Sequence, residues 1–425
     1  MVDRRETVAQ GGQAQGKQAQ GKQAQGKQAQ PARDWSWNFW PVLPLYPYGQ
    51  RRTLRYEIVK DTIWTFDQIQ GILYTVVPIR MTVVKLLRGG LLVYAPVAPT
   101  PECLRLLQEL IDQHGDVQHI VLPTSSGLEH KIFVGPFARR FRQAQVWIAP
   151  SQWSFPLNLP LSWLGFPAKR TQVLPIDSQQ TPWADEFDYA ILELDLGRGA
   201  FSEVAFLHRR SRTLLVTDAL IAMPDQPPEI VQLDPYPLLF HARDSAADPI
   251  VDTPENRRKG WQRICLFSVY FRPSALEPVQ LGQAVKAARQ SPDRSRQNYF
   301  GLYPFRWQSG WEQSFARLRA GGRPFVAPIL QTLIFPQAPQ RVLDWADRIA
   351  HWPFERVIPC HLDAPIVMQP QQFRQAFRFL EKSARSVGSA DAWNLPLPEA
   401  DFTFIRELET TLVKRGIARP AQGKV

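Results

Sequence analysis

The sequence is poor in cysteine and contains no long apolar run. Its three cysteines, Cys103, Cys265 and Cys360, are too few and odd in number for a disulfide framework, which indicates a reducing compartment. No stretch reaches the roughly 18 uninterrupted apolar residues that a membrane-spanning helix needs. The opening residues, MVDRRETVAQ, lack the apolar core of a secretion signal. These absences predict a cytoplasmic protein, with peripheral contact to an internal membrane as the alternative.

Signatures of several common functions are also missing. The sequence has no phosphate-binding loop, dinucleotide fingerprint, serine-hydrolase elbow, RNA-binding motif or helix-turn-helix pattern. Its net charge of +11 gathers in basic clusters at ARRFR (138–142), HRRSR (208–212) and ENRRKG (255–260). We interpret these clusters as solvated loops, with weak contact to an anionic membrane surface as the alternative. The sequence identifies no partner and no oligomeric state.

The remaining composition divides the chain into three predicted parts. Residues 1–34 contain a repeated QAQGK unit with no apolar side chain larger than alanine, which predicts a disordered tail. Residues 35–386 form the predicted folded domain, with an irregular insert at about 225–325. Residues 387–425 form a predicted C-terminal helical extension.

Two segments rich in tryptophan and proline flank the first half of the domain. The first, WSWNFWPVLPLYPYGQ (35–50), has too many prolines for a regular helix, and we interpret it as an extended strap that buries its aromatic rings. An interfacial membrane anchor is the alternative, because Trp and Tyr favour the depth of the lipid headgroups. The second segment (151–167) contains Trp153 and Trp163, which are candidates for pocket or surface contacts.

Between and after these segments, predicted strands and helices alternate. GLLVYA (90–95) is typical of a buried strand, and a helix capped by Thr100 is expected to run to Gly115. Further strands are predicted at 117–122, 145–149, 189–194, 202–208 and 213–220, and further helices near 280–290, 313–319, 371–386 and 402–415.

Acids and histidines follow three of the predicted strands. Glu129 and His130 come after VQHIVL, Asp218 after TLLVT and His361 after RVIPC. Loops at the carboxyl ends of strands commonly gather ligands in α/β folds. Two imidazoles and two carboxylates suit one Zn, Fe or Mn ion with an open position for water, whose pKa the ion would lower towards neutrality. Each residue alone is a weak signal, because such groups also cap turns.

The order and spacing of these segments resemble the metallo-β-lactamase-like fold from about Trp64 to Ser386. GGLLVYAP is placed like the strand that ends in an aspartate in active relatives, and TSSGLEH lies where relatives carry T-H-x-H-x-D-H. RTLLVTDAL resembles the strand that ends in the bridging aspartate, and WPFERVIPCHLDAPI resembles the final helix, strand and P-G-H turn. The resemblance implies an α+β, αββα sandwich.

The run from WPVLPLYPYGQRRT to VIPCHLDAPI is also similar to an uncharacterised domain-of-unknown-function family from cyanobacteria and plastids, and membership of that family implies no activity.

The resemblance also implies that one of two metal sites is lost. Ser125 and Gly127 occupy the first two histidine positions, and Tyr94 and Ala95 stand where the early aspartate and its neighbour would be. No histidine lies within DLGRGAFSE (195–203), where the next one is expected. A two-metal hydrolase is therefore not expected.

The four ligand positions of the second site are kept, with a glutamate in place of an aspartate. They are Glu129, His130, Asp218 and His361. We expect at most one ion there. The alternative is that these residues form a hydrogen-bonded polar cluster that ties the loops together.

Three functional hypotheses remain open. A non-catalytic binding or assembly protein with a degenerate metal site is favoured, and a mononuclear hydrolase of an ester or phosphoester is the first alternative. Peripheral membrane association is the second. Arg257 and Arg258, in DTPENRRKGWQR, are candidates to hold an anionic substrate or lipid headgroup, although a solvated helix is the commoner structure.

Overall fold

The computed structural model describes residues 32–38, 41, 44–125, 129–153, 158–197, 199–382 and 397–422. The predicted disordered tail (1–34) lies almost wholly outside the described residues.

The first sheet has seven strands that follow one another in sequence order. The first four strands pair antiparallel and the last four pair parallel. Along the sheet they are β1 (Leu54–Val59), β2 (Ile63–Ile72), β3 (Thr75–Lys85), β4 (Leu91–Tyr94), β5 (Val117–Leu122), β6 (Gln145–Ile148) and β7 (Thr171–Val173).

The second sheet has five strands, and its central pair, β10 and β15, is parallel. In spatial order the strands are β16 (Ile366–Val367), β15 (Arg356–Pro359), β10 (Thr213–Val216), β9 (Ala200–His208) and β8 (Phe187–Asp195). Two further pairs are short: β11 (Ile221–Ala222) with β14 (Pro324–Phe325), and β12 (Leu276–Pro278) with β13 (Phe305–Trp307).

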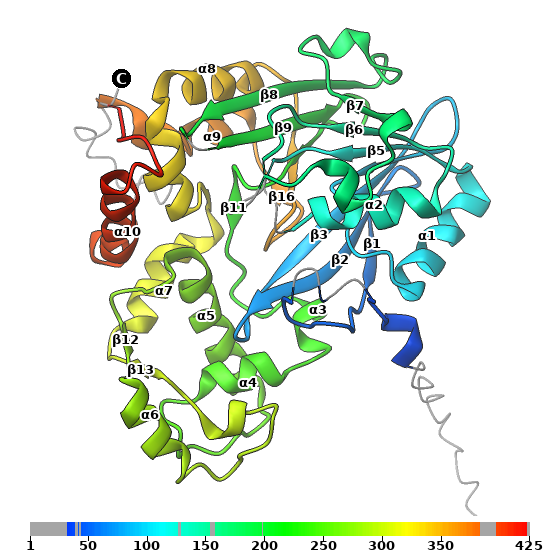
Figure 1. Ribbon diagram of the computed structural model, residues 1–425. Helices are drawn as coiled ribbons and strands as arrows, with labels where there is room; N and C mark the ends of the chain where they lie inside the picture. The colour runs from blue at the N-terminus through cyan, green and yellow to red at the C-terminus, as the bar shows by residue number, and fades with distance from the viewer. Residues whose placement is uncertain are drawn as a thin grey trace, which may run out of the picture.

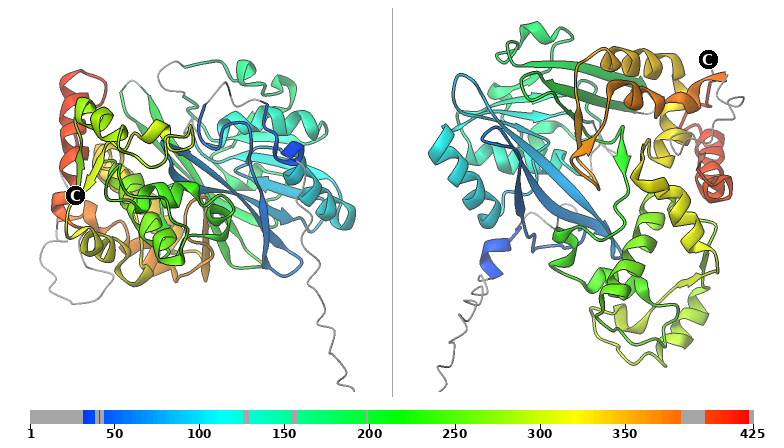
Figure 2. Two further views of the ribbon diagram at one scale, coloured as in Figure 1. Left: turned by 90° about the horizontal axis from the view of Figure 1, so that it is seen from below. Right: turned by 180° about the vertical axis from the view of Figure 1, so that it is seen from behind.

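Helices cover the outer face of each sheet. The helices α1 (Pro101–His114) and α2 (Lys131–Arg140) pack their apolar faces on the first sheet. On the second sheet, α8 (Pro339–Ala350) and α9 (Pro370–Gln375) do the same. Figures 1 and 2 show the two sheets between these helical layers. The architecture is therefore an α+β, αββα sandwich, as the sequence predicted.

The core between the sheets is rich in large aromatic rings. Tyr94 and Trp147 from the first sheet meet Tyr189 and Phe206 from the second, and all four side chains are buried. Helix α1 begins as expected, with the Thr100 hydroxyl accepting from the Cys103 amide at 3.3 Å. The packed sheets fix the ends of their strands, and the loops that leave those ends carry the candidate site.

The insert predicted as irregular contains more helix than the sequence indicated. Two of its helices match those expected near 280–290 and 313–319, and a third begins in DTPENRRKGWQR, where a solvated helix was expected. The remaining helices correct the sequence interpretation. The insert contains α3 (Glu229–Gln232), α4 (Tyr236–Ala242), α5 (Pro254–Tyr270), α6 (Leu281–Ala288) and α7 (Trp311–Arg319). The longest, α5, is buried around much of its circumference, so its sequence lacks the one-sided apolar period of a surface helix. In Figure 1 these helices lie below the sheets, and α10 (Thr403–Lys414) packs beside them.

Candidate metal site

Glu129, His130 and His361 come together between the two sheets. Glu129 and His130 end the loop after β5, directly before α2, and His361 follows β15. One ligand atom from each of the three lies within 4.8 Å of those of the other two. Loops from both sheets therefore supply one cluster of two imidazoles and a carboxylate.

Both histidines are oriented by a backbone carbonyl. Nδ1 of His130 donates to the Pro96 carbonyl at 3.1 Å, and Nδ1 of His361 donates to the Pro78 carbonyl at 3.2 Å. With Nδ1 engaged in this way, Nε2 of each ring is directed to the cluster. A carbonyl partner on the second nitrogen is the arrangement that metal-binding histidines use to fix tautomer and ring orientation.

Two carboxylates share the Nε2 atom of His361. Glu129 Oε2 lies 2.8 Å from it and Asp218 Oδ1 lies 3.1 Å from it. Burial opposes a charge on His361, but the two carboxylates outweigh it and hold the pKa of His361 well above its usual value. Burial likewise opposes the charge on Glu129, yet the attraction of His361 lowers the pKa of Glu129 to about 2. Asp218 thus joins the cluster through His361.

The donor set fits one divalent transition-metal ion. Nε2 of His130 is buried and has no hydrogen-bond partner within the described part of the chain. A buried imidazole nitrogen of this kind costs free energy unless something occupies it. Two imidazole nitrogens and two carboxylates are ligands that Zn, Fe and Mn accept.

The residues at the predicted lost positions are committed to other contacts. Oγ of Ser125 donates to the Ala200 carbonyl at 3.2 Å and accepts from the Ser202 amide at 2.8 Å. Gly127 lies outside the described residues. Tyr94 is fully buried in the core between the sheets, and its hydroxyl donates to the Val204 carbonyl at 3.0 Å.

Glu203 is a site residue that sequence reasoning missed. It lies in β9, in the segment where a histidine was sought, and it is fully buried. Its carboxyl oxygens accept from the backbone amides of Thr217 at 2.8 Å and Asp218 at 3.3 Å. Burial, followed by the charge of Asp218, raises the pKa of Glu203 to about 8. A lone acid in the apolar run SEVAFLH was the one available signal.

Arg80 is the second residue that the sequence did not reveal. It is buried, pairs with Asp67 at 2.7 Å, and donates to the carbonyls of Pro359 at 2.8 Å and Leu362 at 3.0 Å. These carbonyls flank His361 along the chain. Arg80 therefore holds the turn that presents His361.

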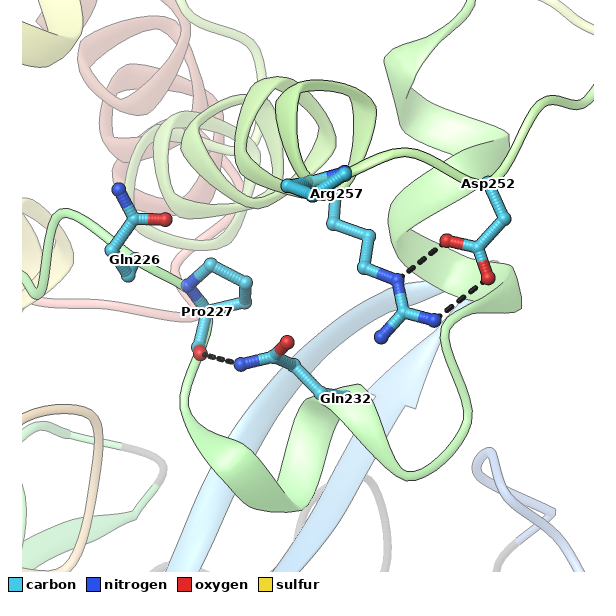
Figure 3. Close-up of a pocket in the computed structure, with 6 residues that line it drawn as sticks. Gln226, Pro227, Gln232, Asp252 and Arg257 are labelled. Carbon is cyan, nitrogen blue, oxygen red and sulfur yellow. Dashed lines mark hydrogen bonds and ion pairs between the residues drawn. The ribbon is translucent and has the colours of Figure 1, made fainter. Parts of the chain in front are cut away.

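The candidate surface residues lie apart from the cluster. Arg257 and Arg258 are each held by a carboxylate, Asp252 at 2.6 Å and Asp225 at 3.0 Å respectively. Arg257 and Asp252 line a hollow of about 360 Å³ between α3 and the start of α5 (Figure 3). None of the residues lining this hollow belongs to the metal cluster, so their role in holding a substrate over the site stays a prediction.

The two aromatic-proline segments differ in how far their tryptophan side chains are buried. Trp37 is 5% exposed and packs edge-on against Phe133 of α2, with ring centroids 5.4 Å apart, as a strap would. In the second segment, the carbonyl of Trp153 accepts from the buried Lys131 ammonium at 2.8 Å. Trp163 is 76% exposed.

A family model described as a domain of unknown function (DUF4336) matches residues 60–379. The chain belongs to this family. The match includes Glu129, His130, Asp218 and His361, and the family description assigns them no role. No curated protein matches the chain.

Several solved structures of low identity are similar to the chain. A DIM-1 metallo-β-lactamase exposed to ceftazidime is 13% identical, with a TM-score of 0.30, over 40% of this chain and 71% of that one. A metallo-β-lactamase from Pontibacter korlensis is 14% identical, with a TM-score of 0.30, over 41% and 76%. A flavo di-iron protein variant from Thermotoga maritima is 9% identical, with a TM-score of 0.38, over 77% of this chain. The chain spans 61% of that flavo di-iron protein.

Proposed function

We propose that this protein binds one divalent transition-metal ion and serves as a non-catalytic binding or assembly protein. The observation that carries the proposal is the convergence of Glu129, His130 and His361 around Nε2 of His130, a buried atom with no hydrogen-bond partner among the described residues. Asp218, which pairs with His361, is the proposed fourth ligand. Zn, Fe and Mn all suit this donor set.

A single ion is proposed because side chains occupy the place of a second site. Tyr94 is part of the packed core, and Ser125 is hydrogen-bonded to the backbone of β9. Neither offers a free ligand atom in place of the carboxylate and imidazole that the resemblance would require. This supports a role that does not use two-metal chemistry.

Calorimetric titration of Zn²⁺ and Mn²⁺ into the EDTA-treated full chain tests the proposal. We expect a stoichiometry of one, and loss of binding in His130→Ala and His361→Ala. His351→Ala is the control, because His351 is an exposed histidine at the end of α8. Heat changes that are equal in all three variants would mean that the ion does not bind at the cluster.

Hydrolysis of an ester or phosphoester is the second candidate function. The side chains of Glu129 and Asp218 keep 28% and 22% of their surface exposed, so solvent can reach the carboxylate side of the cluster. An ion bound there would supply Lewis-acid chemistry and lower the pKa of a water molecule. His130 and His361 would hold the ion, and Arg80 and Glu203 would position the loops.

Turnover of a nitrophenyl phosphodiester by the zinc-loaded chain distinguishes the two candidates. The non-catalytic proposal expects the same rate for the wild type and for His361→Ala. A rate that depends on His361 would favour the hydrolase. The cytoplasmic location and the kinship with cyanobacterial and plastid proteins stay predictions.

A further inference from the structure

Two turns at the end of the molecule that holds the inserted helices expose large apolar side chains. The β2–β3 turn exposes 60% of Ile72 and 54% of Leu73, and the loop before β13 exposes 65% of Phe300. Tyr48, in the N-terminal strap, is 41% exposed. We call these four residues the tip patch.

Buried tyrosines join the members of the tip patch. The ring of Tyr74, next to Leu73, lies 4.9 Å from that of Tyr299, next to Phe300. The Tyr46 ring lies 5.1 Å from Tyr74 and 5.8 Å from Tyr48. In addition, the Tyr74 hydroxyl donates to the Gln297 carbonyl at 2.8 Å. The two turns are therefore neighbours, and Figure 1 shows the β2–β3 turn close to α4.

Both turns hold non-glycine residues in a backbone conformation with positive φ, which is strained for such residues. Ile72 pairs with Thr75, and the two residues between them, Leu73 and Tyr74, have φ values of +49° and +64°. A two-residue hairpin turn with both φ values positive favours Asn and Gly, and a branched or bulky residue there is strained. Tyr74 is buried in the core, but Leu73 is half-exposed.

The second turn repeats this combination of strain and exposure. Phe300 has a φ of +59° and points most of its surface to solvent. Folding alone would favour glycine or asparagine at Leu73 and Phe300. An apolar side chain that is both strained and exposed is therefore better explained by an external contact than by the fold.

Basic side chains surround the tip patch. Arg294 and Arg296, in the same loop as Phe300, are exposed, and neither has an ion-pair partner among the described residues. The two carboxylates nearby are already bound, since Asp293 accepts from the Tyr236 hydroxyl at 3.0 Å and Asp234 accepts from that of Tyr46.

Helix α6 also carries exposed apolar side chains next to a basic one. Leu281 and Val285, 73% and 43% exposed, stand one turn apart, and Arg289 follows one turn later. Helix α6 is close to the Phe300 loop, because a side chain at Gly301 would touch the Ala288 carbonyl. Exposed apolar residues thus lie close in sequence to cations for which the described residues supply no ion-pair partner.

We propose that the tip patch inserts into the headgroup layer of a membrane that contains anionic lipids. Exposed apolar side chains rimmed by polar ones mark a protein or a membrane contact, and apolar side chains combined with basic ones favour a surface of anionic lipids. Arg294 and Arg296 supply the attraction to anionic headgroups. Searched over the described residues, every helix is too short or too polar to span a bilayer, so this contact is a surface one.

Flotation of the full chain with vesicles tests the proposal. At low salt we expect the chain to float with vesicles of phosphatidylcholine and phosphatidylglycerol, and to stay in solution with phosphatidylcholine alone. Because the attraction is partly electrostatic, raising the salt concentration to 0.5 M, an ionic strength with a Debye length of about 4 Å, should weaken binding several-fold.

Tip variants locate the contact. Leu73→Gly relieves backbone strain and removes the apolar side chain, so we expect an unchanged or higher melting temperature with about tenfold weaker vesicle binding. The double substitution Arg294→Gln with Arg296→Gln should weaken binding to anionic vesicles by at least tenfold, at about 1 kcal/mol per charge. The matched controls are Ile176→Gly, 86% exposed on a loop after β7, and Arg142→Gln.

Three results would overturn the proposal. The first is a chain that stays in solution with anionic vesicles at low salt. The second is binding that Trp163→Ser or the controls abolish while the tip variants bind normally, which would assign the contact to the other aromatic segment. The third is a dimer in sedimentation that Leu73→Gly dissociates, which would assign the patch to a second copy of the chain.

Discussion

At the scale of single residues, the candidate site depends on a buried ion pair that sequence patterns do not reveal. The side chains of Arg80 and Asp67 lie on β3 and β2 and are only 4% and 7% exposed. Arg80 also binds the carbonyls on either side of His361. In the sequence, both residues stand in strands with no neighbouring motif, so only the paired strands reveal their connection to the site.

Replacing Arg80 should therefore destabilise the folded protein strongly. We expect Arg80→Met to lower the free energy of unfolding by about 3–5 kcal/mol, because it leaves the Asp67 carboxylate buried and unpaired. The control is Arg209→Met, whose partner Asp188 is 28% exposed and whose loss should cost below about 1 kcal/mol. Urea unfolding measures both values, and equal losses would contradict the role given to Arg80.

His241 is a buried histidine outside the candidate site. Its side chain is fully buried in α4 and stacks on Phe305, with ring centroids 5.8 Å apart. Burial lowers the pKa of His241 to about 3. Burial also lowers the pKa values of His119 and His208, in both cases to about 4.

These histidines should make the fold sensitive to mild acid. Below about pH 6.5 His241 binds a proton in the unfolded chain, whereas in the folded chain it stays neutral until the pH approaches 3. The free energy of unfolding therefore falls as the pH falls through this window. The loss is at most about 1.4 kcal/mol per pH unit for each histidine. His241→Phe should lose less stability than the wild type between pH 7.5 and 5.0 in urea unfolding. An equal pH dependence in the two proteins would show that His241 has the same pKa in the folded and the unfolded chain.

At the scale of elements, the sequence predicted the amphipathic helix α1 and the buried strand β4, and it left out the long hairpin of β2 and β3. Helix α1 has one apolar face, a capping threonine and a terminating glycine, and it was predicted almost to the residue. A solvated helix was expected within DTPENRRKGWQR, but the length of α5 and the burial of its second half were not, because buried residues surround that half and Gly260 is a poor helix former. The glycine is required by packing, since a Cβ atom there would lie 1.8 Å from the Leu238 carbonyl oxygen.

Two glycine substitutions test this account of the insert. Gly260→Ala should destabilise the chain by about 1–3 kcal/mol, because α4 and α5 would have to separate. Gly282→Ala, in α6, should stabilise it by about 0.5–1 kcal/mol, because nothing lies within 4 Å of the added methyl group. Thermal unfolding distinguishes the two variants, and a shift of the same sign in both would contradict the packing.

At the scale of the whole molecule, the two sheets meet at the candidate site. Residues that follow strands β5, β10 and β15 converge there, as expected from the rule that ligands gather where strands end. The structure brings Glu129, His130, Asp218 and His361 together, and their role as metal ligands stays a prediction. The sequence could not locate Glu203, whose contacts depend on the pairing of β9 with β10, or Arg80, whose contacts depend on how the two sheets are stacked.

An ion at this position would link the two sheets. Binding to the folded chain alone raises stability by about 2.7 kcal/mol when the free metal concentration is a hundred times the dissociation constant. We therefore expect EDTA to lower the melting temperature of the wild type and to leave that of His361→Ala unchanged. An equal response of the two proteins would place the ion elsewhere.

The metal content of the purified full-length chain tests the central claim most directly. Elemental mass spectrometry is applied to the wild type and to His130→Ala, purified in parallel. We expect about one Zn, Fe or Mn ion per wild-type chain and a background level in the variant. A wild-type chain that holds no metal, and that still binds none when one equivalent of each ion is supplied, would contradict the account.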